Sequence, residues 1–198
     1  MECLRRLLQK RPNTNVNEQD YSQFTGAGCL FTDGVHVLAG YQPKKREPSI
    51  SGLGGKRLPG ETFKRTALRE TLEELFDIRV RGALLDILEM SMEPKSTMMN
   101  GKYVLLYYSF EDLEVILQYA SSYCGNTQLY DEWPETINDL IFNRRYTEGS
   151  EVAHLCLLPF AQGITISNDL KSDIKLVTSE SGTSAVSAVS GTSAVSAV

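Results

Sequence analysis

The sequence predicts an α+β fold in which helices cover a mixed sheet on both sides, as in an α/β/α sandwich. Three observations lead to it: an amphipathic helix pattern over 61–76, a hairpin signal at Asp33-Gly34, and a continuous apolar run over 103–110 that is typical of a buried strand. Strands and helices follow each other without strict βα alternation, which favours a mixed sheet. The 198 residues fit one domain of ordinary size, and 41% hydrophobic residues argue against wholesale disorder.

The elements follow in order along the chain. Apolar alternation on both sides of Asp33-Gly34 predicts two strands within 27–41. A loop over 42–51 and a glycine-rich segment over 52–60 then precede the helix at 61–76. Beyond that helix we expect strands at 83–90, 102–110 and 151–159, and helices at 111–123, 134–143 and 167–177.

We expect three parts: an N-terminal extension at 1–23, a folded domain at 24–177 and a flexible low-complexity tail at 178–198. The tail contains SGTSAVSAV at 181–189 and repeats it letter for letter at 190–198. The repeated segment 181–198 has no charge, no aromatic ring and no large apolar side chain other than valine, so it cannot bury enough surface to offset its ordering entropy. We interpret it as an appendage without a catalytic part; an aggregation-prone β strip is the alternative.

Charge and composition exclude several function classes. The net charge of −5 rules out a global basic field for nucleic acid or anionic lipid. No apolar run approaches the ~18 residues of a membrane span, and we expect no membrane partner. Four scattered cysteines without a C-x-x-C pair, and only two histidines, disfavour a zinc site and predict reduced thiols in a cytoplasmic compartment.

Three glutamates of the predicted helix at 61–76 share one face. Glu70, Glu73 and Glu74 fall within an arc of about 100°, because a helix turns about 100° per residue. Like charges at this spacing destabilise a helix. Cations that prefer oxygen ligands, Mg²⁺ or Mn²⁺, would offset that repulsion. The alternative is a solvated charged face paired with Lys64 and Arg65.

The loop before this helix complements the acidic face. Gly54-Gly55 permits a close approach of the backbone, and Lys56 and Arg57 supply positive charge. Pro59-Gly60 is a turn signal that directs the chain into the helix. A phosphate chain bridged to the protein by metal ions is a natural ligand for such a pair of features. A merely flexible loop is the alternative.

The spacing G-x5-E-x7-R-E-x-x-E-E resembles the Nudix box, the signature of hydrolases that cleave nucleoside diphosphates linked to another group. The residues that match are Gly55, Lys56, Glu61, Arg69, Glu70, Glu73 and Glu74. The resemblance implies a Nudix-type α/β/α sandwich over 24–177 and a metal-dependent diphosphate hydrolase. MutT-like proteins belong to the same family.

The resemblance also implies a role for each residue of the box. Glu70, Glu73 and Glu74 would be ligands of Mg²⁺ or Mn²⁺, together with the carbonyl of Gly55. Arg69 would orient a glutamate through a charge-assisted hydrogen bond. Of these residues, Glu73, Glu74 and Arg69 form the expected catalytic set.

Further roles follow from the same resemblance. Glu61 would order the junction of loop and helix, and Lys56 and Arg57 would bind substrate. A catalytic base often comes from a loop before a late strand, which makes Glu148 the first candidate and Glu151 the second. Plain surface acids are the alternative for both.

The sequence departs from the family pattern at three positions. Thr71 stands where an aliphatic residue is usual, Phe76 where a glycine normally ends the helix, and Asp77 where an apolar residue is common. We therefore expect an altered helix C-terminus with the metal ligands untouched. The run GGKR…RETLEELF is also similar to Nudix proteins of large DNA viruses, some of which remove mRNA caps; such a protein would act in the host cytoplasm.

The segment 44–69 carries a net charge of +6 in a chain of −5, which suits a polyphosphate or an RNA 5′ end. Two substrate classes therefore compete: a small nucleotide with a diphosphate bond, and capped RNA. The alternative function is a catalytically silent nucleotide-sensing or protein-binding module. Trp133 could stack on a base, but we favour a core role for it.

Overall fold

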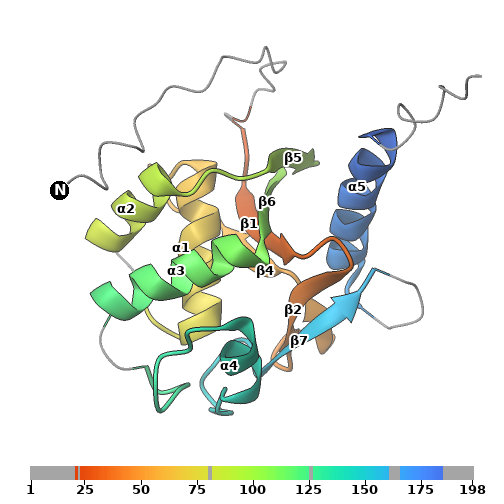
Figure 1. The fold of residues 1–198 in the computed structure, drawn as a ribbon. Coiled ribbons are helices and arrows are strands. Elements are labelled where there is room, and N and C mark those ends of the chain that lie inside the picture. The colour runs from red at the N-terminus through yellow and green to blue at the C-terminus, as the bar shows by residue number, and fades with distance from the viewer. Residues whose placement is uncertain (1–20, 22, 80–81, 125–126, 161–165, 185–198) are drawn as a thin grey trace, which may run out of the picture.

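The computed structural model describes residues 21, 23–79, 82–124, 127–160 and 166–184 (Figure 1). Most of the predicted extension at 1–23 and the tail from 185 onward lie outside the described residues. The strands are β1 (Gly26–Thr32), β2 (His36–Gln42), β3 (Ser49–Ser51), β4 (Leu53–Lys56), β5 (Ser96–Asn100), β6 (Tyr103–Ser109) and β7 (His154–Pro159). The helices are α1 (Phe63–Phe76), α2 (Ala83–Ser91), α3 (Phe110–Tyr123), α4 (Ile137–Phe142) and α5 (Asn168–Ser184).

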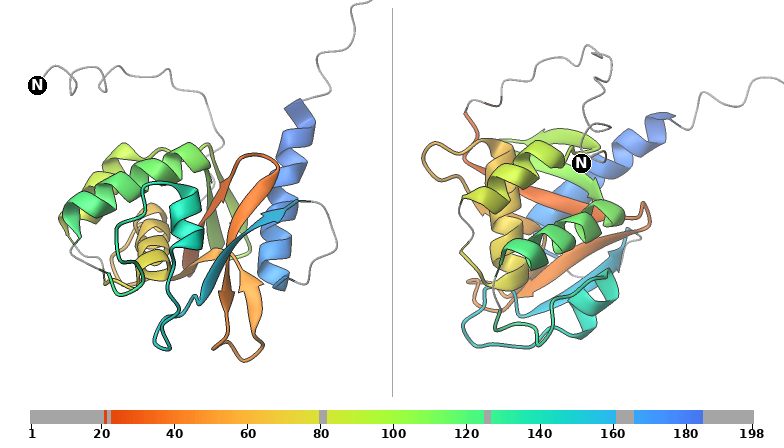
Figure 2. Two further views of the ribbon diagram at one scale, coloured as in Figure 1. Left: turned by 60° about the horizontal axis from the view of Figure 1, so that its bottom comes forward. Right: turned by 60° about the vertical axis from the view of Figure 1, so that its left-hand side comes forward.

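The strands form one mixed sheet, as predicted. Its order is β3-β2-β1-β6-β5, with β4 paired to β1 and β7 paired to β2. Strands β1 and β6 run parallel, from Gly26 opposite Tyr103 to Thr32 opposite Ser109, and every other pairing is antiparallel. Helices α1, α2 and α3 lie on one side of the sheet and α5 lies on the other (Figures 1 and 2). The predicted α/β/α sandwich is confirmed.

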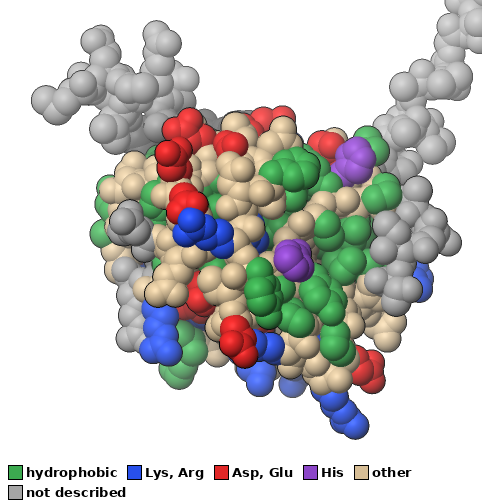
Figure 3. All heavy atoms as spheres, turned by 90° about the horizontal axis from the view of Figure 1, so that it is seen from below, with side chains coloured by type: hydrophobic (Ala, Val, Ile, Leu, Met, Phe, Trp, Pro, Cys, Tyr) green, Lys and Arg blue, Asp and Glu red, His purple; other side chains and the backbone are tan. Residues whose placement is uncertain are grey.

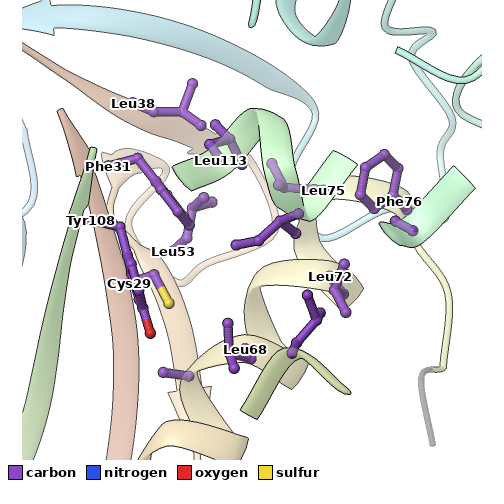
Figure 4. Close-up of a cluster of buried hydrophobic side chains, with 14 of the residues drawn as sticks. Cys29, Phe31, Leu38, Leu53, Leu68, Leu72, Leu75, Phe76, Tyr108 and Leu113 are labelled. Carbon is purple, nitrogen blue, oxygen red and sulfur yellow. The ribbon is translucent and has the colours of Figure 1, made fainter. Parts of the chain in front are cut away.

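Side-chain alternation in β1 builds both halves of the core. Cys29 and Phe31 join the cluster on the α1 side, whereas Leu30 belongs to the cluster packed against α5. Figure 4 shows the first of these clusters, to which Leu68 and Leu72 of α1 contribute together with Cys29 and Phe31 of β1. Since successive strand residues point to opposite faces, one apolar strand can serve two helical layers.

Three parts of the sequence interpretation are wrong in detail. The segment predicted as a strand at 83–90 is helix α2; its buried residues Leu84, Leu85 and Leu88 follow helical spacing, which a short apolar run does not distinguish from a strand. The glycine-rich segment contains strand β4, and β3 and β5 were not predicted. Helix α5 continues to Ser184, beyond the predicted domain end.

Helix α1 begins and ends at identifiable groups. Thr62 is the N-cap, and its hydroxyl accepts a hydrogen bond from the Arg65 amide at 3.0 Å. At the other end Asp77 adopts the left-handed conformation with φ 53°, and its N–H donates to the Glu73 carbonyl at 2.8 Å. The helix thus ends at Phe76, and the left-handed residue that closes it is Asp77, which is the altered C-terminus that the sequence predicted.

Arg144 completes this helix end. Its guanidinium donates to the carbonyls of Glu74 and Leu75, and to the carbonyl of Val152 in the loop before β7. The Thr127 hydroxyl donates to the Phe76 carbonyl at 2.6 Å. These donors satisfy carbonyls that a helix leaves without partners, and they tie α1 to two distant loops.

Replacing Asp77 by glycine is expected to stabilise the protein by about 0.5–1 kcal/mol. A left-handed residue with a Cβ is strained, and glycine at this helix position removes the strain. Urea unfolding of Asp77→Gly and Asp77→Ala beside the parent measures it. The alanine variant should be less stable than the parent, and a glycine variant less stable than the parent would contradict this account.

Within the part of the chain that the structure describes, no helix is both long and apolar enough to cross a membrane.

Candidate functional site

The three glutamates of the box lie on α1 at different depths. Glu74 is buried, with 4% of its surface exposed, whereas Glu70 and Glu73 are half-buried. The face that carries them turns toward β4, which precedes the helix in the chain and pairs with β1. The fold therefore brings the glycine loop and the acidic face together, as the sequence predicted.

Arg69 connects the members of the box. Its side chain is 6% exposed, and it donates to both oxygens of Glu61 at 2.7 and 3.1 Å. It also donates to Glu70 at 2.8 Å, to Glu73 at 3.0 Å and to the carbonyl of Lys56 at 2.9 Å. These bonds use the whole planar fork of the guanidinium, so Arg69 fixes the acidic face and the preceding loop relative to each other.

Glu61 holds the junction of loop and helix, as expected. Besides the two bonds from Arg69, its carboxylate accepts from the Leu58 amide and the Thr66 hydroxyl, each at 3.0 Å. Burial alone would raise the pKa of Glu61, but these hydrogen bonds favour the charged form and lower it. Glu61 is thus an ionised, structural partner of Arg69.

The two glycines before the helix are needed because the backbone passes against side chains. A Cβ on Gly55 would lie 2.4 Å from the Glu70 carboxylate, and a Cβ on Gly54 would lie 2.1 Å from the Tyr103 hydroxyl. Gly54 also has a φ of +150°, which favours glycine. The Gly54 amide donates to Glu74 at 2.7 Å. The backbone of Gly54-Gly55 therefore lies against Glu70 and Glu74 of the acidic face, as the predicted close approach required.

Glu74 lies in an environment that disfavours its charge. Its oxygens accept from the Gln42 side chain and from the Gly54 amide, both at 2.7 Å. Burial raises the pKa of Glu74 to about 8; the Gly54 amide opposes this shift, and the charges of Glu151 and Glu70 add to it. Burial likewise raises the pKa of Glu70. Burial and the neighbouring carboxylates thus disfavour negative charge on this face.

The residues fit a divalent cation in part. Among the described residues, no three acidic, histidine or cysteine side chains stand in the arrangement of a formed metal site. Arg69 holds one oxygen each of Glu70 and Glu73, and the second oxygen of each accepts no hydrogen bond from the described part of the chain. Both oxygens of Glu74 are engaged. The free oxygens suit Mg²⁺ or Mn²⁺ chemically, and reorientation of Glu70 and Glu73 would have to bring them together.

The predicted basic residues are placed differently from one another. Lys56 is exposed at the end of β4. The Arg57 guanidinium lies 4.3 Å from the centroid of the Phe24 ring, and its Nε donates to the Glu61 carbonyl at 3.1 Å. Lys45, which the sequence singled out only as part of a basic run, acts on Glu74 through its charge and donates to Ser51 at 3.2 Å.

The two candidates for a catalytic base also differ. Glu148 is exposed. Glu151 is exposed as well, but its charge raises the pKa of both Glu70 and Glu74. The bond from Lys44 to the Gly149 carbonyl, 2.9 Å long, ties their loop to the basic segment. Glu151 is therefore the acid of this loop that shares the electrostatic environment of the box.

Trp133 and the two histidines contact side chains outside the acidic face. The Trp133 ring packs 4.6 Å from that of Phe76, which agrees with the favoured core role. His36 pairs with Asp33 at 3.0 Å, and His154 stacks on Tyr146. Figure 3 shows the histidines on the surface among hydrophobic side chains. None of these contacts involves the acidic face.

A cavity of about 290 Å³ opens between the sheet and α5, next to the glycine loop. Its apolar lining includes Leu30, Leu105 and Leu170. At one side lies Asp173 of α5, which is 6% exposed and accepts a 3.3 Å hydrogen bond from Asn100 of β5. No local pattern in the sequence indicates this cavity, because its walls come from segments far apart in the chain.

Asp173 should make stability depend on pH. Burial raises its pKa from 3.8 to about 6, the Asn100 hydrogen bond lowers it, and the charge of Asp169 raises it further; Lys45 and Tyr103 line the same cavity. Since the folded pKa exceeds the unfolded one, the charged form costs stability, and the cost grows from about pH 4 and is complete above about pH 6.

We therefore expect Asp173→Asn to be more stable than the parent by about 2 kcal/mol at pH 8 and equally stable near pH 3.5. Urea unfolding of both proteins across this pH range measures the difference. A difference that stays constant with pH would contradict the buried charge.

No protein-family model matches the chain, and no curated protein matches it. Several solved structures match the chain. A bifunctional NMN adenylyltransferase/ADP ribose pyrophosphatase from Francisella tularensis, complexed with AMP and a manganese ion, shares 12% identity and a TM-score of 0.44; the match covers 80% of this chain and only 42% of that one.

Two shorter proteins match over most of their length. A structure from work on MutT of Aliivibrio salmonicida and Vibrio cholerae shares 14% identity and a TM-score of 0.41, with 79% of this chain and 97% of that chain covered. The Nudix hydrolase RenU from M. smegmatis shares 12% identity and a TM-score of 0.45, with 81% and 87% covered. In its mixed sheet and flanking helices, this chain is similar to solved Nudix and MutT hydrolases.

Proposed function

We propose that this protein is a divalent-metal-dependent hydrolase that cleaves a diphosphate bond in a nucleoside diphosphate linked to another group. The observation that carries the proposal is the acidic face of α1, where Glu70, Glu73 and Glu74 meet the Gly54-Gly55 loop and are held by Arg69. Such a concentration of partly neutralised carboxylates needs a cation, and a cation held there attracts phosphate.

The metal would be Mg²⁺ or Mn²⁺, held by the free oxygens of Glu70 and Glu73 and by the Gly55 carbonyl. When bound, it would neutralise phosphate charge and lower the pKa of a water molecule. Glu74, whose carboxylate is fixed by Gln42 and the Gly54 amide, would complete the ligand set or hold a proton at its raised pKa. Arg69 would keep Glu70 and Glu73 in reach of the ion.

Glu151 is the better placed of the two candidate bases, because its charge couples to Glu70 and Glu74. We expect Glu151→Gln to lower kcat on the order of 10-fold to 100-fold, and Glu148→Gln to lower it less, since loss of a general base has an effect of about that size or larger. Rates measured with one substrate from pH 6 to 9 decide between them. A larger loss for Glu148→Gln would assign the base to that residue instead.

Lys45, Lys56 and Arg57 supply the positive charge for the substrate. Lys45 lines the cavity beside the glycine loop, so it lies where a phosphate chain could pass between the cavity and the acidic face. The substrate class is a small nucleotide with a diphosphate bond or the cap of an RNA, both of which carry a base and a phosphate chain. No element of the proposal requires a membrane.

A second function is favoured by one observation. Arg69 bridges Glu70 and Glu73, and no formed metal site exists among the described residues. A box locked in this state would bind a nucleotide without hydrolysing it. This would make the protein a catalytically silent nucleotide-sensing or protein-binding module.

Turnover decides between the two functions. The purified chain is incubated with Mg²⁺ or Mn²⁺ and with nucleotide sugars, dinucleoside polyphosphates, nucleoside triphosphates and capped RNA, and the products are identified by mass. We expect at least one substrate to be cleaved at a phosphoric anhydride bond, and chelation of the metal to stop the reaction. Nucleotide binding without any cleavage would favour the silent module.

A further inference from the structure

Arg144 lies between the end of α1 and the loop that leads into β7. Its Nη2 nitrogen donates to the carbonyl of Glu74 at 2.9 Å and to the carbonyl of Val152 at 2.8 Å. Glu74 belongs to the acidic face, and Val152 directly follows Glu151 in the chain. One nitrogen atom therefore joins the backbone of the acidic face to the backbone beside the better placed of the two candidate bases.

The other end of this guanidinium is held as well. Nη1 donates to the carbonyl of Leu75 and, at 3.1 Å, to the hydroxyl of Tyr130. Tyr130 is buried, and its hydroxyl donates in turn to the carbonyl of Leu140 at 2.8 Å. A guanidinium is planar and rigid, so acceptors on both Nη atoms determine where each carbonyl lies relative to the others.

These contacts do more than complete the end of a helix. A donor that served only the last turn of α1 would reach the carbonyls of Glu74 and Leu75 and would need no third carbonyl. Arg144 also reaches Val152, and its Nε–H is buried without an acceptor among the described residues. A buried donor without a partner costs stability, and the hydrogen bonds of the two Nη atoms offset that cost. The arrangement is that of a link between two segments.

The loop held in this way is firmly attached on both sides of Glu151. The amide and the hydroxyl of Ser150 both donate to the Thr147 carbonyl, at 3.2 and 2.9 Å, and close a turn. Val152 is fully buried, and a Cβ on Gly40 would lie 2.6 Å from its Cγ1 atom, so its side chain packs directly on β2. Glu151 itself is exposed, so its place relative to α1 depends on this backbone.

We infer that Arg144 is a positioning residue: it fixes the loop of Glu151 against the end of α1 and so sets the place of Glu151 beside the acidic face. This inference rests on the proposed function, since it assigns a role in the same reaction. The electrostatic effect of Glu151 on Glu70 and Glu74 agrees with such a placement. A displacement of a catalytic group by about 1 Å lowers a rate on the order of up to 100-fold, so the link matters for turnover.

The test introduces Arg144→Lys into the parent and into Glu151→Gln. Lysine keeps the positive charge, but its ammonium has three donors where the guanidinium serves four acceptors. With the best substrate of the turnover screen, we expect Arg144→Lys to lower kcat on the order of 10-fold and to leave KM within about 2-fold. In Glu151→Gln the same change should lower kcat by less than about 2-fold, because Arg144 acts through Glu151.

The matched control is Arg145→Gln, because Arg145 is the neighbouring arginine and its guanidinium pairs with Asp131 at the surface. This variant should keep the parent's kcat. Equal losses of kcat for Arg144→Lys in both backgrounds would overturn the inference, because the effect would then not pass through Glu151. A loss that appears in KM alone would overturn it too.

A second measurement does not depend on turnover. Hydrogen exchange at the amides of Ser150 and Ala153 reports on the loop, since these amides donate to the carbonyls of Thr147 and Tyr41. In Arg144→Lys both should exchange on the order of 10-fold faster, while the amides of β6 keep the parent's rates. Unchanged exchange would contradict the inference, and so would an equal acceleration in β6, which would mean a general loss of stability.

The two measurements also separate this inference from the proposed function. Faster exchange in the loop without cleavage of any substrate would leave the positioning role of Arg144 standing and remove the hydrolase. Cleavage by the parent together with unchanged exchange in Arg144→Lys would do the opposite.

Discussion

Replacing Glu73 with glutamine is expected to lower metal-dependent turnover on the order of 100-fold to 1000-fold while leaving the fold intact. Glu73 is the most accessible of the three glutamates, and one of its oxygens accepts from Arg69 at 3.0 Å. A glutamine keeps an oxygen for that hydrogen bond, so packing should not change. It loses the charge that would hold a divalent cation against phosphate, and such a contribution is worth several kcal/mol in the transition state.

The measurement is kcat and KM for the best substrate of the screen, over a range of Mg²⁺ and Mn²⁺ concentrations. Partial rescue by excess metal is expected if Glu73 acts as a ligand. Glu132→Gln, an exposed acid outside the site, serves as the matched control, and urea unfolding checks that both variants remain folded. A Glu73→Gln variant with the parent's turnover number would sink the hydrolase assignment.

Local patterns in the sequence predicted the parts of the site that local chemistry determines. The three glutamates share a helical face because a helix has a fixed turn per residue, and Gly55 is required because Glu70 passes against it. The altered end of α1 was also predicted, since Phe76 stands where the resemblance places the glycine that would end the helix. The sequence did not show which groups donate hydrogen bonds to the last carbonyls of this helix.

The hydrogen-bond donors that satisfy the carbonyls at the end of α1 come from far along the chain. Arg144 donates hydrogen bonds to the carbonyls of Glu74 and Leu75, about seventy positions earlier in the chain. The Thr127 hydroxyl donates to the carbonyl of Phe76, 51 positions earlier. Long-range contacts of this kind leave no periodic pattern in one sequence. The same limit explains the cavity: Asn100 and Asp173 face each other only because β5 and α5 meet at the sheet.

Short apolar runs account for the errors in secondary structure. The segment that forms α2 has only nine residues, and its leucines suit a helix or a strand on periodicity alone. Strand β4 was missed because two of its four residues are glycines, which normally weaken a strand. In the fold these glycines are needed for the contacts with Glu70 and Tyr103, so close packing overrides local propensity.

Replacing Arg69 with methionine is expected to destabilise the protein by about 3–5 kcal/mol, the largest stability effect among the changes considered. Arg69 is buried and gives two hydrogen bonds to Glu61, which is itself 9% exposed. Without the arginine, the Glu61 charge stays buried with only the Leu58 amide and the Thr66 hydroxyl as donors. Arg69→Lys should recover little of the loss, because one ammonium group cannot replace a planar fork that reaches several acceptors.

Two further measurements separate this cause from a general loss of packing. Adding Glu61→Gln to Arg69→Met removes the unpaired charge, so the double variant should be more stable than Arg69→Met alone at pH 7. The pKa of Glu61 is lowered in the parent, so its pairing stabilises the fold above the unfolded pKa and is lost as the pH falls through the folded one. Urea unfolding should therefore show the gap between parent and Arg69→Met shrinking from pH 7 to pH 3. A gap that is equal at both pH values, with no gain from Glu61→Gln, would mean that Arg69 supports the site through its methylenes and not through its charge.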